Sequence, residues 1–437
     1  MIKKSRVPFG VWIMAVAWGI SFCPLWLSRI GGTWTILGML LVGLVGLVLK
    51  NKGASFEFAI REGLIRNGGM MILLGLYYLM VIVSALRYGF NWNEDSFILK
   101  LHVVNIIALF FGFFLIKNPR YFRICIYVSA LFMLFQATLL RRFVDVTGEG
   151  ARLGLIEAGG VLGHTSNWEG FAMQTLLLLG ILLEEKNKVV KIIGFLILPL
   201  FYRGILLCGF ATPVALFLLG HGVLGILFLL FAKPTKLALL LKVAIPCIFI
   251  TAMILTVTWI RTMPPDSRYR DIQYRFDNFI NDPLWGGYER DDRTQSRLFL
   301  GLVSWESFKR SPVFGTGGVY PSSRVLEYGG HQAVVDYLAV FGIAGGGPFI
   351  LFVLLCLSNS IRRYRKEQTW VSAASIAVVV IFIGGGCVNP CWYGFPMTVM
   401  LLYAQPFKIS YFRVFRDGAM VMKRQQMKLA MGSYING

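Results

Sequence analysis

Charged residues are scarce in this sequence of 437 residues. They make up 15% of the chain, hydrophobic residues make up 56%, and the mean hydropathy is +0.66. A soluble fold of this length could not bury so much apolar surface, so the composition excludes a soluble globular protein. The apolar runs are long enough for helices that cross a bilayer, and a helix satisfies its own backbone hydrogen bonds within lipid. The composition therefore predicts an all-α, polytopic membrane protein.

Acidic residues and metal-ligand patterns are also in short supply. The chain has 22 Asp and Glu against 43 Lys and Arg, and the basic residues cluster in short loops at alternate helix ends. This placement is typical of membrane topology rather than of a nucleic-acid surface, so we expect a lipid membrane and no nucleic acid as partner. No His or Cys pattern has the spacing of a zinc site. Cys387 and Cys391 in CVNPC either pair or remain two free thiols.

The apolar runs predict about twelve membrane-spanning helices in a single domain over residues 1–437. The first span follows three basic residues and lacks a small-residue cleavage site, so we expect it to be retained. A basic connector at 50–66 separates the second and third spans. The predicted spans are 8–28, 34–49, 68–86, 101–116, 124–140, 171–183, two within 190–231 with a break around 203–213, 237–260, 344–360, 370–386 and 394–406.

The distribution of Lys and Arg predicts the orientation of the chain. With the N-terminus inside, the inner loops and the tail hold about 25 of these residues and the short outer loops about seven. Both termini are therefore expected in the cytoplasm. The long polar segment 261–330, inserted between the ninth and tenth spans, is then expected outside as one large helical loop.

Segment 261–330 has the character of a binding surface. It holds ten basic and nine acidic residues, and nine of the ten basic residues are Arg, whose planar fork matches phosphate and carboxylate oxygens. A helix is predicted from Asp292 to Lys309, because Leu298, Leu302, Trp305 and Phe308 recur at helical spacing on one apolar face. Arg297 lies beside this face.

Two further arginines extend a cationic stripe. Arg290, Arg293 and Arg297 recur at spacings of three and four, so they share one side of a helix that starts early. Arg290 and Arg293 are expected either to bind an anionic substrate or to form salt bridges with Asp291, Asp292 or Glu289. Arg297 is the better functional candidate.

Glycines and one histidine follow this helix. The run GTGG at 315–318 supplies backbone that turns tightly or approaches a ligand. His331 is expected to open the next helix, with Gly342 near the same face. Asp336 is expected to lie well round that helix from His331.

The run HQAVVDYLAVFGIAG resembles the signature of the O-antigen ligase and polymerase family. His331-Gln332, Gly342 and Gly345 fit its spacing, and the upstream stretch SRLFLGLVSWESFKRSPVFGTGG, with Arg297, Gly315 and Gly317, is similar to another stretch of that family. These motifs cover about 55 residues, while the arrangement of spans with a late outer loop agrees over the whole chain.

The resemblance implies a metal-independent glycosyltransferase of a bacterial inner membrane, without a cofactor. Its donor would be a glycan on an undecaprenyl-pyrophosphate carrier, and its acceptor a hydroxyl of lipid A core or of a growing glycan. Arg297 would contact the pyrophosphate, because a fixed guanidinium stabilises the charge of the leaving group. His331 would act as base or orient the acceptor, because imidazole titrates in the useful range.

The family also carries an arginine where its seventh and eighth spans meet. Arg203, in Tyr202-Arg203-Gly204, is one placement, whereas the stretch 209–213 fits the break and has no arginine. An arginine within a span is costly and therefore a functional candidate.

Other functions remain open at this stage. A ligase and a polymerase share the donor chemistry and differ in the acceptor, with a protein as a third acceptor. A transporter of lipid-linked glycans also fits twelve spans, although matched broken helices in two halves, typical of that class, are not evident in the sequence.

Overall fold

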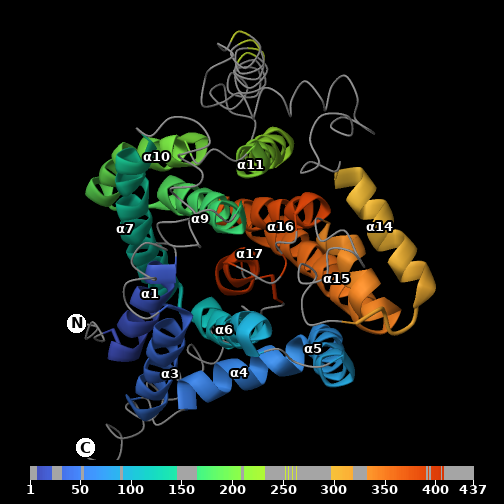
Figure 1. Cartoon of the computed structure of the whole chain (residues 1–437). Coiled ribbons are helices and arrows are strands. Elements are labelled where there is room, and N and C mark those ends of the chain that lie inside the picture. Colours follow the sequence, from blue (N-terminus) through green and yellow to red (C-terminus); the bar gives the residue numbers. More distant parts are fainter. Residues whose placement is uncertain are drawn as a thin grey trace, which may run out of the picture.

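The computed structural model in Figure 1 describes most of the apolar part of the chain. The described residues are 7–21, 32–50, 54–88, 92–144, 165–207, 211–231, 251, 254, 258, 262, 297–317, 332–389, 392, 395–404, 406 and 407. All regular secondary structure within these ranges is helical. The helices are α1 (Phe9–Ser21), α3 (Gly32–Lys50), α4 (Ala54–Arg66), α5 (Gly68–Tyr88), α6 (Trp92–Lys117), α7 (Pro119–Val144), α9 (Thr165–Glu184), α10 (Lys188–Leu207), α11 (Ala211–Phe231), α14 (Arg297–Arg310), α15 (Ala333–Glu367), α16 (Trp370–Val388), α17 (Phe395–Val399) and a π-helix (Met400–Ala404).

Seven of these helices are long and apolar enough to cross a membrane, namely α5, α6, α7, α10, α11, α15 and α16. Shorter apolar helices occupy Phe9–Ser21, Thr35–Leu49 and Phe395–Ala404. The prediction of an all-helical, polytopic membrane protein is therefore confirmed. The count of twelve spans stays a prediction, and of the expected span 237–260 the structure describes only residues 251, 254 and 258.

Most of the basic connector at 50–66 forms a helix, α4, that the sequence did not predict. Phe56 and Ala59 are buried on one side of α4, and a Cβ at Gly63 would lie 2.5 Å from the ring of Phe113 on α6. Glu62 forms ion pairs with Arg66 at 2.7 Å and with Lys117 of α6 at 2.6 Å. Close packing and these ion pairs hold the helix in place.

The boundary between the seventh and eighth predicted spans is also defined. Helix α10 continues through Arg203 to Leu207, and α11 begins at Ala211. Pro213 therefore lies in the first turn of α11, where a proline is tolerated because its missing N–H would have no partner within the helix.

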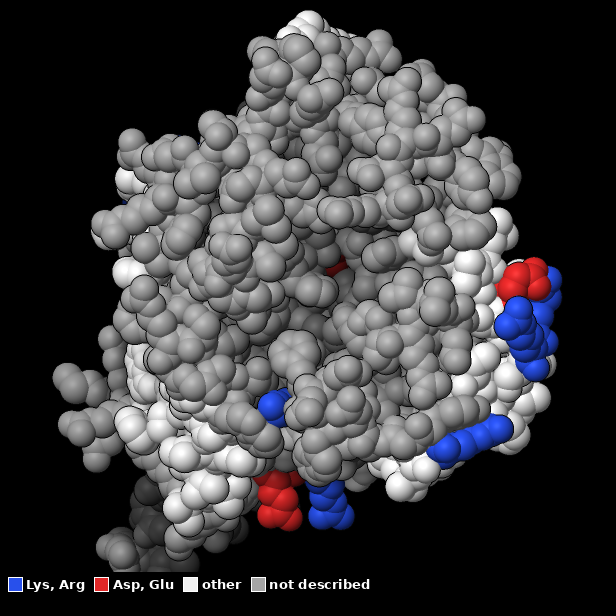
Figure 2. Space-filling model, viewed as in Figure 1, with Lys and Arg blue, Asp and Glu red and all other residues white. Residues whose placement is uncertain are grey.

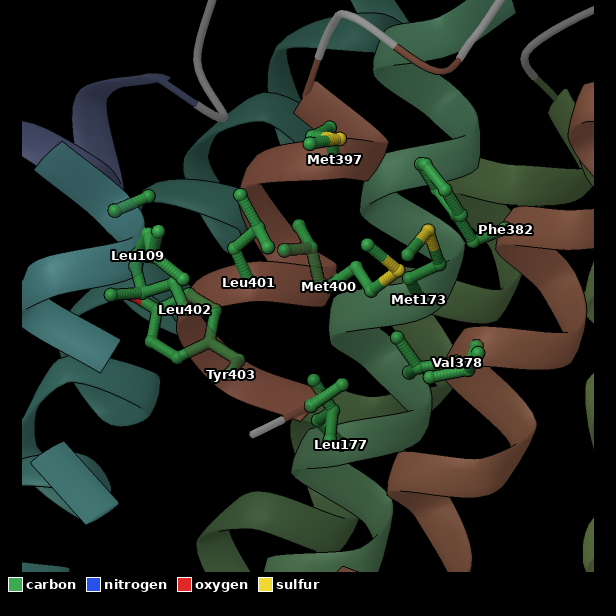
Figure 3. Packing of buried hydrophobic residues seen from close by; sticks show 14 of the residues in the cluster. Leu109, Met173, Leu177, Val378, Phe382, Met397, Met400, Leu401, Leu402 and Tyr403 are labelled. Carbon is green, nitrogen blue, oxygen red and sulfur yellow. The ribbon is translucent and has the colours of Figure 1, made fainter. Parts of the chain in front are cut away.

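The centre of the bundle is the short pair formed by α17 and the π-helix, with α6, α9 and α16 around it (Figure 1). Every residue from Pro396 to Ala404 is buried. Figure 3 shows Met400, Leu401 and Leu402 packed among Leu109 of α6 and Met173 of α9. A helix that is apolar on all sides belongs inside a bundle, so this expected twelfth span is a core element.

Small residues let other helices approach closely. A Cβ at Gly10 of α1 would lie 2.5 Å from the carbonyl oxygen of Gly43 on α3. A Cβ at Gly345 of α15 would lie 2.7 Å from Cβ of Met80 on α5. Because lipid tails are as apolar as the side chains, helices in a membrane associate through close packing, which small residues permit.

Candidate functional site at the junction of α14 and α15

The second turn of α14 and the start of α15 meet through polar groups. A Cβ at Gly301 of α14 would lie 2.5 Å from Oε1 of Gln332, the residue that caps α15. One turn further along α14, the Ser304 hydroxyl donates to Oδ1 of Asp336 at 2.5 Å, and the backbone N–H of Gln332 donates to Oδ2 at 2.8 Å. Asp336 is fully buried. The two helices therefore run parallel here, and their N-terminal ends lie close together.

The predicted helix from Asp292 to Lys309 is confirmed over Arg297–Arg310, and its first residues lie outside the described ranges, but its apolar face does not face the protein as a whole. Leu302 and Trp305 are exposed, whereas Leu300, Gly301, Ser304 and Ser307 are buried. A small, polar face permits the close approach that the hydrogen bonds to Asp336 require. Helix α14 thus buries a face that is made mostly of small residues and leaves two large apolar side chains outside.

Residues 311–317, which we call the hook, follow α14 and pair with a break in α15. Gly342 has φ 61° and ψ −168°, so α15 is kinked there. The backbone N–H groups of Thr316 and Gly317 donate to the carbonyls of Ala339 and Val340, at 2.8 and 3.0 Å. Beyond the kink, the N–H groups of Ile343 and Ala344 donate to the carbonyls of Pro312 and Val313, at 2.8 and 3.0 Å.

The motif glycines Gly315 and Gly342 make this crossing possible. Both have positive φ, and a Cβ on either would lie about 2 Å from a backbone carbonyl oxygen, of Val340 for Gly315 and of Val313 for Gly342. Gly317 also has positive φ. The sequence left two roles open for these glycines, a tight turn or an approach to a ligand. In the described residues, Gly315 and Gly342 instead let two segments of backbone approach each other.

A second group of buried polar side chains lies inside the bundle. Glu169 of α9 is buried and accepts a hydrogen bond from the Asn389 amide at 2.5 Å, and the Thr398 hydroxyl of α17 donates to Oδ1 of Asn105 of α6 at 2.7 Å. Ionisable residues inside a membrane bundle are costly and are functional candidates by default. Sequence reasoning missed Glu169, although a lone acid at the start of an apolar run, in NWEGFAM, is a usable signal.

An aromatic cluster connects α15 to this interior. The ring of Tyr337 stacks on Tyr77 of α5 at 5.6 Å and contacts Trp392 at 5.7 Å, while Tyr77 lies 6.0 Å from the buried ring of His102. The Trp392 indole N–H donates to the carbonyl of Phe382 on α16 at 2.9 Å. The start of α15 is therefore packed against α5 and the residues that follow α16, and Tyr77 of α5 links it to α6.

The predicted charged residues fall partly outside the described ranges. His331, Arg290 and Arg293 lie outside them, and Arg297 is described only as the first backbone position of α14. Arg297 lies one helical turn before Gly301, and His331 directly precedes Gln332 in the chain.

Arg203 is not brought to this junction. Its side chain is exposed on α10, beside Tyr202, whose hydroxyl is hydrogen-bonded to Nε2 of His221 at 2.5 Å. Helix α10 and helix α14 lie at opposite edges of the bundle in Figure 1, with α9 and α16 between them. Gly345, the last motif glycine, faces Met80 within the α5–α15 contact.

The fold and the apolar helices define a multi-pass helical membrane protein. No protein-family model matches this chain, and no curated protein matches it. The resemblance to the O-antigen ligase and polymerase family stays a prediction from the motif residues named above.

Proposed function

We propose that this protein is a membrane glycosyltransferase of the O-antigen ligase type. It transfers a glycan from an undecaprenyl-pyrophosphate carrier to an acceptor hydroxyl on the periplasmic side of a bacterial inner membrane, with both chain termini in the cytoplasm. The support comes from the family motifs and from the contact between the second turn of α14 and the start of α15.

The contact between Gly301 and Gln332 is the observation that carries this proposal. Arg297, a guanidinium donor, lies one helical turn before Gly301, and His331, an imidazole, directly precedes Gln332. The reaction needs both groups at one place, because a pyrophosphate must leave as a hydroxyl attacks. The parallel approach of the two helices makes such a pairing reachable.

The proposed reaction assigns one role to each group. The acceptor oxygen attacks the anomeric carbon of the donor glycan and forms the new glycosidic bond, and the bond from that carbon to the phosphate oxygen breaks. The pyrophosphate leaves with the electron pair, and Arg297, with Arg290 and Arg293, stabilises its charge. His331 takes the acceptor proton or orients the hydroxyl.

Reconstitution tests this proposal. Purified protein in vesicles, supplied with a lipid-linked glycan and an acceptor, is expected to join them. His331→Ala and Arg297→Ala are expected to lose this activity at normal expression. Arg310→Ala is the matched control, since Arg310 is an exposed arginine at the other end of α14. Equal activity of Arg297→Ala and Arg310→Ala would remove Arg297 from the mechanism.

The identity of the acceptor requires a separate experiment. Loss of a ligase leaves long polymer on the carrier lipid, whereas loss of a polymerase leaves single repeat units there. A deletion strain is expected to accumulate the long polymer. Accumulation of single repeats would convert the proposal into a polymerase with the same donor chemistry.

The kink of α15 favours one second candidate, a transporter of lipid-linked glycans. Transporters often carry discontinuous helices at their binding sites, and α15 is interrupted at Gly342. Flipping of the lipid-linked glycan in vesicles, without glycan joining, would favour the transporter over the transferase.

A further inference from the structure

The outer face of α14 and the hook carries a group of exposed apolar side chains. Leu302 is 55% exposed, Trp305 45%, Val313 53% and Phe314 56%. A loop in water would turn these side chains inward, and α14 instead buries Ser304 and Ser307. A clustered apolar surface of this kind marks a contact with something apolar.

The patch continues into the exposed face of a membrane span. Ile343 is 58% exposed, and its backbone N–H is hydrogen-bonded to Pro312, next to Val313 in the hook. Leu351 and Leu354 lie on the same face of α15, further along the helix, and are also exposed. Because α15 is one of the helices suited to cross the bilayer, the hook borders a surface that contacts lipid tails.

The backbone of the hook suits a low-dielectric environment. Irregular backbone is tolerated at membrane depth only where its polar groups find partners inside the protein. Two carbonyls of the hook accept hydrogen bonds from α15, and two of its N–H groups donate to α15. The N–H of Gly315 also donates to the carbonyl of Ser311 at 2.9 Å, so Val313 and Phe314 project from a segment that backbone hydrogen bonds hold against α15.

The charged side chains of α14 fit the level of the lipid headgroups. Glu306, Lys309 and Arg310 are exposed beside Leu302 and Trp305, and Lys309 pairs with Glu306 at 2.6 Å. Figure 2 shows acidic and basic side chains gathered at the rim of the molecule over α14, next to uncharged surface. Tryptophan and lysine are favoured at the interface of bilayer and water, where the lysine stem lies on apolar surface and the amine reaches water.

We propose that α14 and the hook form an interfacial element that rests on the membrane, with Leu302, Trp305, Val313 and Phe314 in contact with lipid. The proposal adds a contact with lipid to the expectation that segment 261–330 forms one large helical loop outside the membrane. It does not depend on glycan transfer, because it concerns the position of α14 relative to the bilayer and not the roles of Arg297 and His331.

Accessibility of single spin labels tests the proposal. The seven native cysteines are replaced, one label is placed at position 302, 305 or 314, and the protein is reconstituted in vesicles of phosphatidylethanolamine and phosphatidylglycerol without any carrier lipid or glycan. Oxygen concentrates in lipid and a charged nickel chelate in water. The ratio of oxygen to nickel accessibility is expected to be several-fold higher at these positions than at the matched control, position 306.

Two results would overturn the proposal. Ratios equal to that at position 306 would place the patch in water. Shielding from both reagents would mean that a second protein surface covers it. A photoreactive benzoylphenylalanine in place of Trp305, with all native cysteines kept, gives an independent readout, because lipid contact predicts cross-links to phospholipid and shielding predicts cross-links to protein.

Discussion

The central pair of α17 and the π-helix buries its large apolar residues, whereas α14 exposes two of them. From Pro396 to Ala404 every residue is buried and nearly all are apolar, as Figure 3 shows for Leu401 and Leu402. Helix α14 buries Gly301, Ser304 and Ser307 and exposes Leu302 and Trp305. In a protein whose surroundings are apolar, hydrophobicity alone does not tell which side of a helix faces the core. Size and hydrogen bonding decide instead.

The largest expected effect comes from the backbone crossing. Gly342→Ala places a methyl group 2.2 Å from the carbonyl oxygen of Val313, at a backbone conformation that only glycine adopts easily. We expect a loss of more than about 3 kcal/mol in the free energy of unfolding, measured by denaturant titration in detergent. Gly347→Ala in the same helix is the matched control, because its Cβ meets its nearest neighbour at 3.6 Å. Equal losses would mean that the crossing does not stabilise the fold.

The comparison of the two regions is tested directly by a pair of leucines. Leu401 is fully buried and Leu302 is 55% exposed. Leu401→Ala is expected to cost about 2–5 kcal/mol, as is usual for a large-to-small change in a core. Leu302→Ala is expected to cost less than about 0.5 kcal/mol. Both values are measured by the same titration, and a reversed order would show that α14 packs by its apolar face after all.

The smallest expected effect concerns α4, where charge rather than packing is at stake. Partial burial raises the pKa of Glu62, but hydrogen bonds and charges from Lys117 and Arg66 outweigh it, so the pKa lies below its ordinary value. The stabilising contribution is therefore present above the pKa of the unfolded chain and is lost as the pH falls through the lowered pKa. Glu62→Gln is expected to cost about 1 kcal/mol or less at neutral pH.

This cost is expected to shrink as the pH is lowered below about 4, which is close to the ordinary pKa of a glutamate. Thermal unfolding of the two forms across pH measures it. A difference that stays constant with pH would exclude the ion pairs as its cause.

The spans were the most predictable part of the fold. Runs such as 68–86 and 370–386 correspond to α5 and α16, because a span needs little more than length and low polarity. Helix α4 was missed because its charged residues are typical of a loop, although Phe56 and Ala59 form a buried face. The position of the last apolar run at the centre could not be read from hydropathy, which is equally high for lipid-facing and buried helices.

The junction was predictable in its glycines and not in its contacts. The motifs identified Gly315 and Gly342 as functional candidates. They did not indicate that Gly315 would lie against the carbonyl of Val340, or Gly342 against that of Val313. The pairing of Ser304 with Asp336 joins residues 32 positions apart, which no local pattern specifies. A stripe of Gly301, Ser304 and Ser307 opposite a lone acid in an apolar run is the signal that could have indicated it.

An interrupted span is commonly a hinge. In α15, hydrogen bonds across the interruption at Gly342 oppose bending. The hook is bonded to the carbonyls of Ala339 and Val340 on one arm of the helix and to the N–H groups of Ile343 and Ala344 on the other. Rotation of one arm against the other would break bonds on at least one side. Any movement of one of these segments is therefore expected to carry the hook and both arms of α15 together as one piece.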